Sequence, residues 1–535
     1  MSRTDGAVRP GNGLTRRGLL RRGLGAIAGM GLLEISPSTT GRAATAAPPA
    51  RGGTLVFATG AEALNLDPPY AGDGPSNIPT SMIYNNLVKF VSSTNLDTAP
   101  DLATSWKVDG TAWTFKLRRG VVFHDGTACD AHAVASHFNR LLGPEKPLRA
   151  SLWVPFVDRV EALDDTTVRF TTKVPDPSFL LRMANSTGAV ESPAAFAKYG
   201  KDLARHPVGT GPFKFQEWVQ NEHITLVRNE SYWGDKAHLD AVVIRPTIDP
   251  SARVIALTAG DVQLASAIPP EQVRRIVGDP RLGIVTIEPL ATYFLGMNVL
   301  KKPFTDLRVR RALNYAVDKA AIIKDIFQGM GEVLSTLVPR GAAGFAQVPG
   351  FPYDPARAKQ LLAEAGYPNG FSSTMLVTNG TTKELEFEQF VQEQWAAIGV
   401  RVTLQPAEWD RYLELLRMPP TSSPLEMWLD SWAAIEAGEI IWDRFGCRMF
   451  RPVGQNTAGY CNEDLDDLLA QARRTLDQTT RDGVLAKAQA LVSQQAPAVW
   501  MIQLQAVAGV SRRLHNPIFK KTGLLTVDEH TWLES

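Results

Sequence analysis

The chain has 535 residues, of which 44% are hydrophobic and 21% are charged, an ordinary balance for a soluble globular protein. A chain of this length forms two or more domains, each with its own core. The formal net charge is +1, but residues 1–46 hold seven Lys/Arg against two Asp/Glu, so the remainder carries a net charge of −4. This mildly acidic body argues against nucleic-acid binding and against adhesion to anionic lipid, since both need a basic surface.

Residues 1–46 are predicted to be an export signal. Arg16-Arg17 resembles the twin-arginine export motif, and a weakly apolar stretch follows at 24–33. That stretch is shorter than the roughly 20 residues that cross a bilayer, and Ala-Thr-Ala at 44–46 offers a small-residue cleavage site. A disordered basic tail is the alternative. Because no cysteine precedes Cys129, we expect a mature protein without a lipid anchor and without membrane insertion.

Short strands are predicted in the first half of the chain, because β-branched and alternating apolar segments there are bounded by Gly, Asn and Asp. They fall at 54–58, 113–118, 157–173 (two strands around a turn at 164–165), 213–218 and 223–228. Asp130 is predicted to cap a helix that carries Val134, Phe138 and Leu141 on one face.

Long amphipathic helices are predicted in the second half, with short strands between them. The helices fall at 307–327, 355–365, 384–398, 463–476 and 481–495, and the strands at 375–378, 401–405 and 427–431. Asp354-Pro355 marks a helix start and Gly366 a helix end. This alternation predicts α/β layers.

Three cysteines are present. Cys447 and Cys461 lie 14 positions apart in a loop-rich stretch, and in an oxidising compartment such a pair is predicted to form a disulfide. Two free thiols are the alternative. Cys129 is then unpaired, and we expect it to be buried as a small apolar residue.

Catalytic and metal-binding motifs are absent from the sequence. There is no zinc-protease, phosphate-loop or nucleophile-elbow pattern. His132 and His137 are five positions apart, which favours surface or helix-end histidines over a shared metal. His124-Asp125-Gly126 is first of all a turn signal. The chain is therefore not predicted to be an enzyme, and no cofactor or metal is expected.

Several sequence blocks resemble the peptide/nickel class of bacterial extracellular solute-binding proteins, family 5, which serve ABC importers. The matching blocks are WKVDGTAWTFKLRRGVVFHDG at 106–126, PVGTGPF at 207–213, RNESYWG at 228–234, FTDLRVRRAL at 304–313, 353–367, GYCN at 459–462 and APAVW at 496–500. Their order and spacing extend the resemblance over about residues 52–520. Gly209 and Gly211 in the second block are expected to allow a tight chain crossing.

The resemblance implies an α/β fold of the type II periplasmic binding protein class (cluster C), with two large hinged lobes and an extra smaller domain. The expected division is 52–92, 207–299 and 505–535 for domain I, 93–206 for the extra domain II, and 300–504 for domain III. The hinge is expected near 298–302, with a return crossing near 503–507.

The resemblance also suggests where a ligand would lie. Trp432 matches a ligand-proximal tryptophan of the family, and an Asp three residues later usually pairs with a peptide's α-ammonium; here that residue is Ile435. Either the adjacent Glu436 takes over, or the ligand has no free amino terminus there, and the sequence favours the second. Other candidates for the cleft wall are Tyr293 and Phe294, with core packing as the alternative.

One further wall candidate is Leu66, after the first strand. The expected partners are a peptide or small-molecule ligand and an inner-membrane ABC permease, and we expect a periplasmic monomer. Alternatives are a binder of an opine, a glycoside or an aromatic acid on the same fold, a secreted hydrolase, and a periplasmic chaperone or signalling protein. A direct nickel site is disfavoured because no His lies between His238 and His515.

Overall fold

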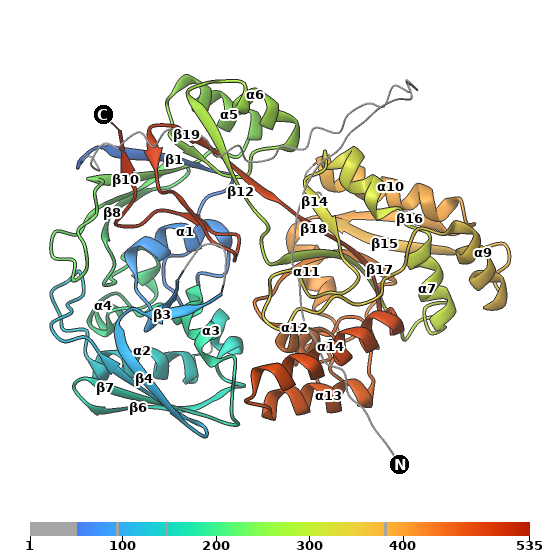
Figure 1. Ribbon diagram of the computed structural model, residues 1–535, viewed down its shortest axis with the longest axis horizontal. Helices are drawn as coiled ribbons and strands as arrows, with labels where there is room; N and C mark the ends of the chain where they lie inside the picture. Colours follow the sequence, from blue (N-terminus) through green and yellow to red (C-terminus); the bar gives the residue numbers. More distant parts are fainter. Residues whose placement is uncertain (1–50, 92–95, 146, 379–381, 535) are drawn as a thin grey trace, which may run out of the picture. The chain divides into compact units, whose positions relative to one another are not determined.

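The structure is a computed structural model that describes residues 51–91, 96–145, 147–378 and 382–534. The export signal predicted at 1–46 lies outside these described residues. Three main sheets organise the described chain, and each has helices packed against it (Figure 1).

A seven-stranded sheet forms the first lobe, lobe I, with strand order β12-β19-β11-β1-β10-β9-β8. Its strands are β1 (Thr54–Thr59), β8 (Phe213–Val219), β9 (His223–Arg228), β10 (Ala241–Pro246), β11 (Leu264–Ala265), β12 (Leu282–Ile287) and β19 (Ala506–Ser511). The helices of this lobe are α1 (Gly74–Ile83), α5 (Pro250–Ala259) and α6 (Val273–Val277). β1 is parallel to both of its neighbours and nearly fully buried, as expected of a central strand covered on two faces.

A four-stranded antiparallel sheet, β4-β5-β7-β6, forms the extra domain. Its elements are β4 (Ala103–Asp109), β5 (Ala112–Leu117), β6 (Val157–Asp164), β7 (Thr167–Thr172), α2 (Ala131–Leu142), α3 (Phe179–Ala184) and α4 (Pro193–Tyr199). The predicted cap is present, because the Asp130 side chain accepts a hydrogen bond from the backbone N–H of Ala133. Cys129 is buried in the core of this domain.

A six-stranded sheet, β14-β18-β13-β17-β15-β16, forms lobe II. Its strands are β13 (Ala291–Met297), β14 (Gly331–Val333), β15 (Ser372–Thr378), β16 (Arg401–Ala407), β17 (Met427–Ala433) and β18 (Ala498–Leu504). Its helices are α7 (Leu307–Tyr315), α8 (Lys319–Ala321), α9 (Pro355–Glu364), α10 (Thr382–Ala396), α11 (Trp409–Leu416), α12 (Ala437–Phe445), α13 (Glu463–Arg474) and α14 (Gln478–Gln495).

Short elements complete the described chain. They are the strand pairs β2 (Val88–Phe90) with β3 (Thr98–Pro100), β20 (Leu514–His515) with β23 (Trp532–Leu533), and β21 (Ile518–Phe519) with β22 (Leu525–Thr526), the 3-10 turns Leu148–Leu152, Ser186–Gly188, Gly200–Arg205 and Pro270–Gln272, and a π-helical turn at Ile322–Ile326. No helix among the described residues combines the length and the apolar character that crossing a bilayer requires.

The chain passes between the two lobe sheets at two places. The first passage lies between β12 and β13, because β13 pairs with β17 and β18 of the six-stranded sheet. This passage is earlier than the predicted hinge at 298–302, and it assigns residues 291–297 to lobe II rather than to domain I. The second lies between β18 and β19, inside the predicted return segment 503–507, and Figure 1 shows these two strands following one another across the lobes.

Two helix predictions differ from the structure. The segment predicted as one helix at 307–327 is broken after α7, because the Asp318 side chain caps a new turn at Ala321. α11 and α12 were not predicted at all. Glu436 is the N-cap of α12: its backbone is extended and its side chain accepts a hydrogen bond from the N–H of Glu439.

Gly209 and Gly211 lie against the end of α1. A Cβ atom at either position would come within 2.2–2.3 Å of a backbone oxygen, Ile83 O for Gly209 and Met82 O for Gly211. No side chain fits in that space, so both positions require glycine for close backbone approach.

Candidate functional site

A cleft of about 1110 Å³ is lined by residues of lobe I, the extra domain, lobe II and the C-terminal segment. Lobe I contributes Gly60, Ala61 and one face of α1, and the extra domain contributes residues 184–187. Lobe II contributes residues 432–436 and one face of α12, and the C-terminal segment contributes 516–530. A cavity of this size holds a peptide-sized solute.

Trp432 and Ile435 both border the cleft. Trp432 lies near the end of β17 and pairs with Thr292 of β13, so the sheet holds its backbone in place. The guanidinium of Arg444 lies 3.7 Å from the centroid of the Trp432 ring, and Arg444 is itself bonded to Asp430 at 3.1 Å. The indole is therefore positioned by a cation–π contact, which suits a rigid stacking wall.

Glu436 borders the cleft, but its carboxylate has other partners. The side chain is 3% exposed. Its Oε1 accepts from Arg481 at 2.6 Å, and its Oε2 accepts the N–H of Glu439 at 2.7 Å. Burial raises the pKa of Glu436, while Arg481 opposes that shift. Because both oxygens are engaged, the geometry does not favour Glu436 as the partner of a ligand ammonium.

Two side-chain contacts bridge the extra domain and lobe II beside the cleft. Arg182 of α3 donates to Glu439 of α12 at 2.7 Å. Arg481 of α14 donates to Ser178, the residue before α3, at 3.0 Å. Both arginine side chains are 5% exposed, so the bridging charges are shielded from water and their attraction is stronger than at a surface.

Tyr293 and Phe294 do not border the cleft. They are consecutive residues of β13, so their side chains lie on opposite faces of the six-stranded sheet. Tyr293 packs on one core cluster of lobe II, and Phe294, 4% exposed, belongs to the other. Core packing, the alternative that the sequence left open, accounts for both contacts.

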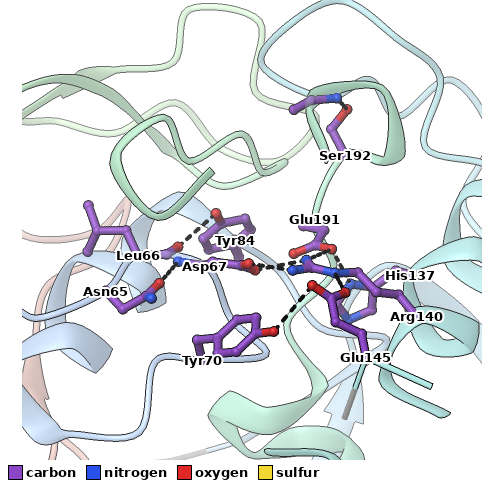
Figure 2. Close-up of polar contacts among 11 residues, drawn as sticks. Asn65, Leu66, Asp67, Tyr70, Tyr84, His137, Arg140, Glu145, Glu191 and Ser192 are labelled. Carbon is purple, nitrogen blue, oxygen red and sulfur yellow. Dashed lines mark hydrogen bonds and ion pairs between the residues drawn. The ribbon is translucent and has the colours of Figure 1, made fainter. Parts of the chain in front are cut away.

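Leu66 lies in the core of lobe I, is fully buried, and does not border the cleft. Its carbonyl accepts from the Tyr84 hydroxyl at 3.0 Å, as Figure 2 shows. The next residue, Asp67, enters a buried charge cluster with Arg140 and Glu191. The position after the first strand therefore joins lobe I to the extra domain.

In this cluster Arg140 of α2 bonds both oxygens of Asp67, at 2.7 and 3.1 Å, and also bonds Glu191 at 2.5 Å (Figure 2). Burial and the neighbouring Glu191 raise the pKa of Asp67 to about 8. His137 is buried beside Glu191, with 3.5 Å between Nδ1 and Oε1. Burial lowers the pKa of His137 to about 3. The expectation of a surface or helix-end histidine is therefore wrong for His137, which lies inside an interdomain contact.

Three comparisons relate the chain to known proteins. A family model described as bacterial extracellular solute-binding proteins, family 5, middle, matches residues 97–438. The glutathione-binding protein GsiB of Pectobacterium atrosepticum is 33% identical over 466 residues, which cover 86% of this chain and 90% of GsiB. The chain belongs to the family 5 bacterial extracellular solute-binding proteins.

Two solved structures of this family share the fold. The periplasmic binding protein DppA of Helicobacter pylori, in complex with the peptide STSA, is 30% identical, covers 91% of this chain and 99% of DppA, and has a TM-score of 0.79. The oligopeptide-binding protein AppA of Bacillus subtilis, in complex with a nonapeptide, is 26% identical, covers 91% of this chain and 100% of AppA, and has a TM-score of 0.79. The predicted fold class, type II with two lobes and an extra domain, is confirmed.

Two charged residues of this family 5 protein were not identified from the sequence. Asp443 of α12 and Lys520 of the C-terminal segment both border the cleft. Within the described chain, neither side chain forms a hydrogen bond or an ion pair. A spacing of three and four residues places 436, 439, 440 and 443 on one helical face, but that signal depends on predicting α12.

The described residues contain no group of three or more His, Cys, Asp or Glu side chains placed to hold a metal ion. The family comprises solute-binding transport proteins. What the cleft provides chemically is a stacking surface, polar groups fixed by other side chains, and charges of both signs without a partner among the described residues, which include Asp443 and Lys520.

Proposed function

We propose that this protein captures a short peptide or a peptide-like solute, such as glutathione, in the cleft and delivers it to an inner-membrane ABC permease. Family membership makes the chain the substrate-binding component of such an importer. The observation that carries the proposal is the cleft of about 1110 Å³, bordered by both lobes and by Trp432. Glutathione is the first candidate because GsiB, a relative that covers most of this chain, is named for it.

The binding wall in this proposal includes Trp432 and Ile435, with Glu436 as a buried support of α12. A three-domain division follows the three sheets, with the boundary of domain I moved to the passage between β12 and β13. Ligand binding then closes the two lobes around the passages at 287–291 and 504–506. This motion requires a ligand that binds the closed state more tightly than the open state.

Export belongs to the same proposal. Residues 1–46 act as a twin-arginine-type signal that is removed, and the mature protein is a periplasmic monomer without a lipid anchor and without catalytic activity. Arg16-Arg17 before the weakly apolar stretch supports this route.

Calorimetry on the purified mature protein tests the ligand class. Glutathione and trialanine represent peptides, and a mannopine-type opine, an aryl glucoside and an aromatic acid represent the alternatives. We expect saturable binding of at least one of the two peptides. Binding of an opine, a glucoside or an aromatic acid alone would contradict the peptide assignment. Catalytic turnover of any of these compounds would favour the alternative that the protein is a secreted hydrolase.

A further inference from the structure

One face of α12 presents three carboxylates to the cleft, and only two of them have dedicated partners. Glu436 is bonded to Arg481 and Glu439 to Arg182. Asp443, one helical turn beyond Glu439, also borders the cleft but has no hydrogen-bond or ion-pair partner in the described chain. A carboxylate that is partly removed from water in the cleft wall is stabilised when a ligand brings a cation to it.

Three of the guanidinium groups that act on Asp443 have other contacts. Arg182 bonds Glu439, and Arg444 bonds Asp430. Arg473 lies over the Trp442 ring, 4.1 Å from its centroid. These cations support the ionised carboxylate at a distance, and they leave its oxygens open towards the cleft.

A second charge without a partner among the described residues borders the same cleft, on the C-terminal segment. Lys520 follows β21 in the C-terminal segment, and its ammonium has no hydrogen-bond or ion-pair partner among the described residues. The charged groups that act on the Lys520 ammonium are Asp528, Asp101, Lys89 and Glu529, and none of them forms an ion pair with it. The cleft thus carries an open carboxylate on lobe II and the open ammonium of Lys520 on the C-terminal segment, and Lys89, exposed at the same cleft, adds a second ammonium without a partner among the described residues.

We propose that Asp443 binds the free ammonium of a zwitterionic peptide in this cleft, and that Lys520 binds a carboxylate of the same molecule. This inference rests on the proposed function and names the ligand chemistry at each wall. In this proposal a residue of α12 binds the ligand's ammonium, because Ile435 carries no charge and the Glu436 carboxylate is already bonded to Arg481. The ligand then joins the two walls, because each of its charged ends meets a different one.

The pKa values of the two groups agree with this geometry. Burial and the neighbouring Glu439 raise the pKa of Asp443 to about 6, and burial lowers the pKa of Lys520. Both shifts show a charge that is partly dehydrated without a contacting counter-charge. The other charged groups that face Asp443 are Glu439 and Arg444 on α12, Arg182 on α3, Arg473 on α13 and Arg451 in the following loop.

The first test compares free and N-acetylated forms of glutathione and trialanine on wild type and on Asp443→Asn by calorimetry. Acetylation removes the ammonium charge, so we expect wild type to lose about tenfold or more in affinity. Asp443→Asn should bind the free peptides about tenfold more weakly and should discriminate little between free and acetylated forms. The matched control is Asp464→Asn, an exposed carboxylate of α13 outside the cleft.

The second test addresses Lys520. Lys520→Met keeps the length of the side chain and removes its charge. We expect this variant to lose the preference of wild type for glutathione over its diethyl ester, which keeps the ammonium but has no carboxylate, whereas the exposed control Lys487→Met keeps that preference. Equal preference in Lys520→Met and wild type would overturn the role of Lys520.

The third test measures the peptide affinity of wild type over a range of pH values, so it does not depend on whether a variant folds. Because the pKa of Asp443 lies near 6 in the protein, its carboxylate takes up a proton as the pH falls below that value, and the affinity for the free peptides should fall with it. The acetylated peptides should not show this loss. Failure of wild type to bind either free peptide contradicts the proposed function. Two outcomes would contradict this inference alone, provided that wild type binds the free peptides. One is that acetylation weakens binding equally in Asp443→Asn and in wild type. The other is that the affinity of wild type does not fall at low pH.

Discussion

Trp432 shows how single side chains define the cleft. Its backbone is fixed by pairing with Thr292, and the Arg444 guanidinium covers the ring at 3.7 Å. The residue still borders the cleft, so the indole offers a flat surface to a solute. A rigid aromatic wall loses little conformational entropy when a ligand stacks on it.

We expect Trp432→Ala to weaken glutathione binding by at least about 30-fold, since truncation of a well-buried aromatic anchor commonly costs more than about 2 kcal/mol. Isothermal calorimetry measures this change. Trp106→Ala in the extra domain, outside the cleft, is the matched control and should bind as wild type does. Equal affinity of Trp432→Ala and wild type would show that the indole serves only the core of lobe II.

At the scale of elements, the segment between α12 and α13 is closed by a disulfide. Cys447 and Cys461 are bonded, with Cα atoms 4.5 Å apart. The bond closes the irregular segment between the end of α12, which borders the cleft, and the start of α13. A cross-link at this place keeps the C-terminal end of α12 in register with the rest of lobe II.

Closing a loop of this length contributes about 3 kcal/mol in the chain-entropy model. We expect the Cys447→Ser/Cys461→Ser variant to lose up to that amount of unfolding free energy, measured by urea denaturation. Thiol titration of denatured, non-reduced mature protein should detect one thiol, from Cys129. Three titrating thiols would show that the bond does not form in the isolated protein.

The buried Asp67–Arg140–Glu191 cluster joins the loop after β1 to α2 of the extra domain (Figure 2). Burial and the charge of the second carboxylate, Glu191, disfavour ionisation of Asp67, so the Asp67 carboxyl retains its proton at neutral pH. The pKa of Asp67 is raised from 3.8 to about 8, which means that the folded state holds this proton more tightly than the unfolded state does. The contribution to stability is therefore complete below pH 3.8 and is lost as the pH rises towards 8.

We expect Asp67→Asn to reduce the fall of unfolding free energy between pH 5 and 8 by up to about 1.4 kcal/mol per pH unit, because the amide has no proton to lose. Urea unfolding at several pH values measures the slope. Asp464→Asn serves as the surface control. A slope in Asp67→Asn equal to that of wild type would show that Asp67 titrates with an ordinary pKa in the folded protein.

At the scale of the whole molecule, two chain passages and two bridging contacts connect the parts around the cleft. The passages lie between β12 and β13 and between β18 and β19. The contacts Arg182–Glu439 and Arg481–Ser178 join the extra domain to lobe II. If the lobes open about the passages, these contacts must break, so they belong to the closed arrangement.

We expect saturating glutathione to reduce the radius of gyration of the mature protein, measured by small-angle scattering. Glu439→Gln removes the charge that Arg182 contacts, so without glutathione this variant should have a radius at least as large as that of wild type. A wild-type protein that is already closed would show a smaller radius than Glu439→Gln before any addition. An identical radius in all four samples would contradict closure about these passages.

The sequence by itself determined the family, the strand and helix alternation and the pairing partners of the local hairpins. The blocks at 106–126 and 207–213 contain turn residues and alternating apolar and polar residues. Both signals involve only residues close together in the chain, so they can be recognised from the sequence. The two glycines at 209 and 211 were recognised for the same reason, since their need for space is a property of the residue type.

Only the tertiary structure decided which side chains face the cleft. Tyr293 and Phe294 match family positions, but strand pairing places them on the two faces of a covered sheet, where both pack on cores. Glu436 had the required charge, but Arg481, 45 positions away in sequence, engages it. Asp443 and Lys520 border one cleft although 77 positions separate them. Such groupings arise from packing between distant segments, and local sequence patterns do not encode them.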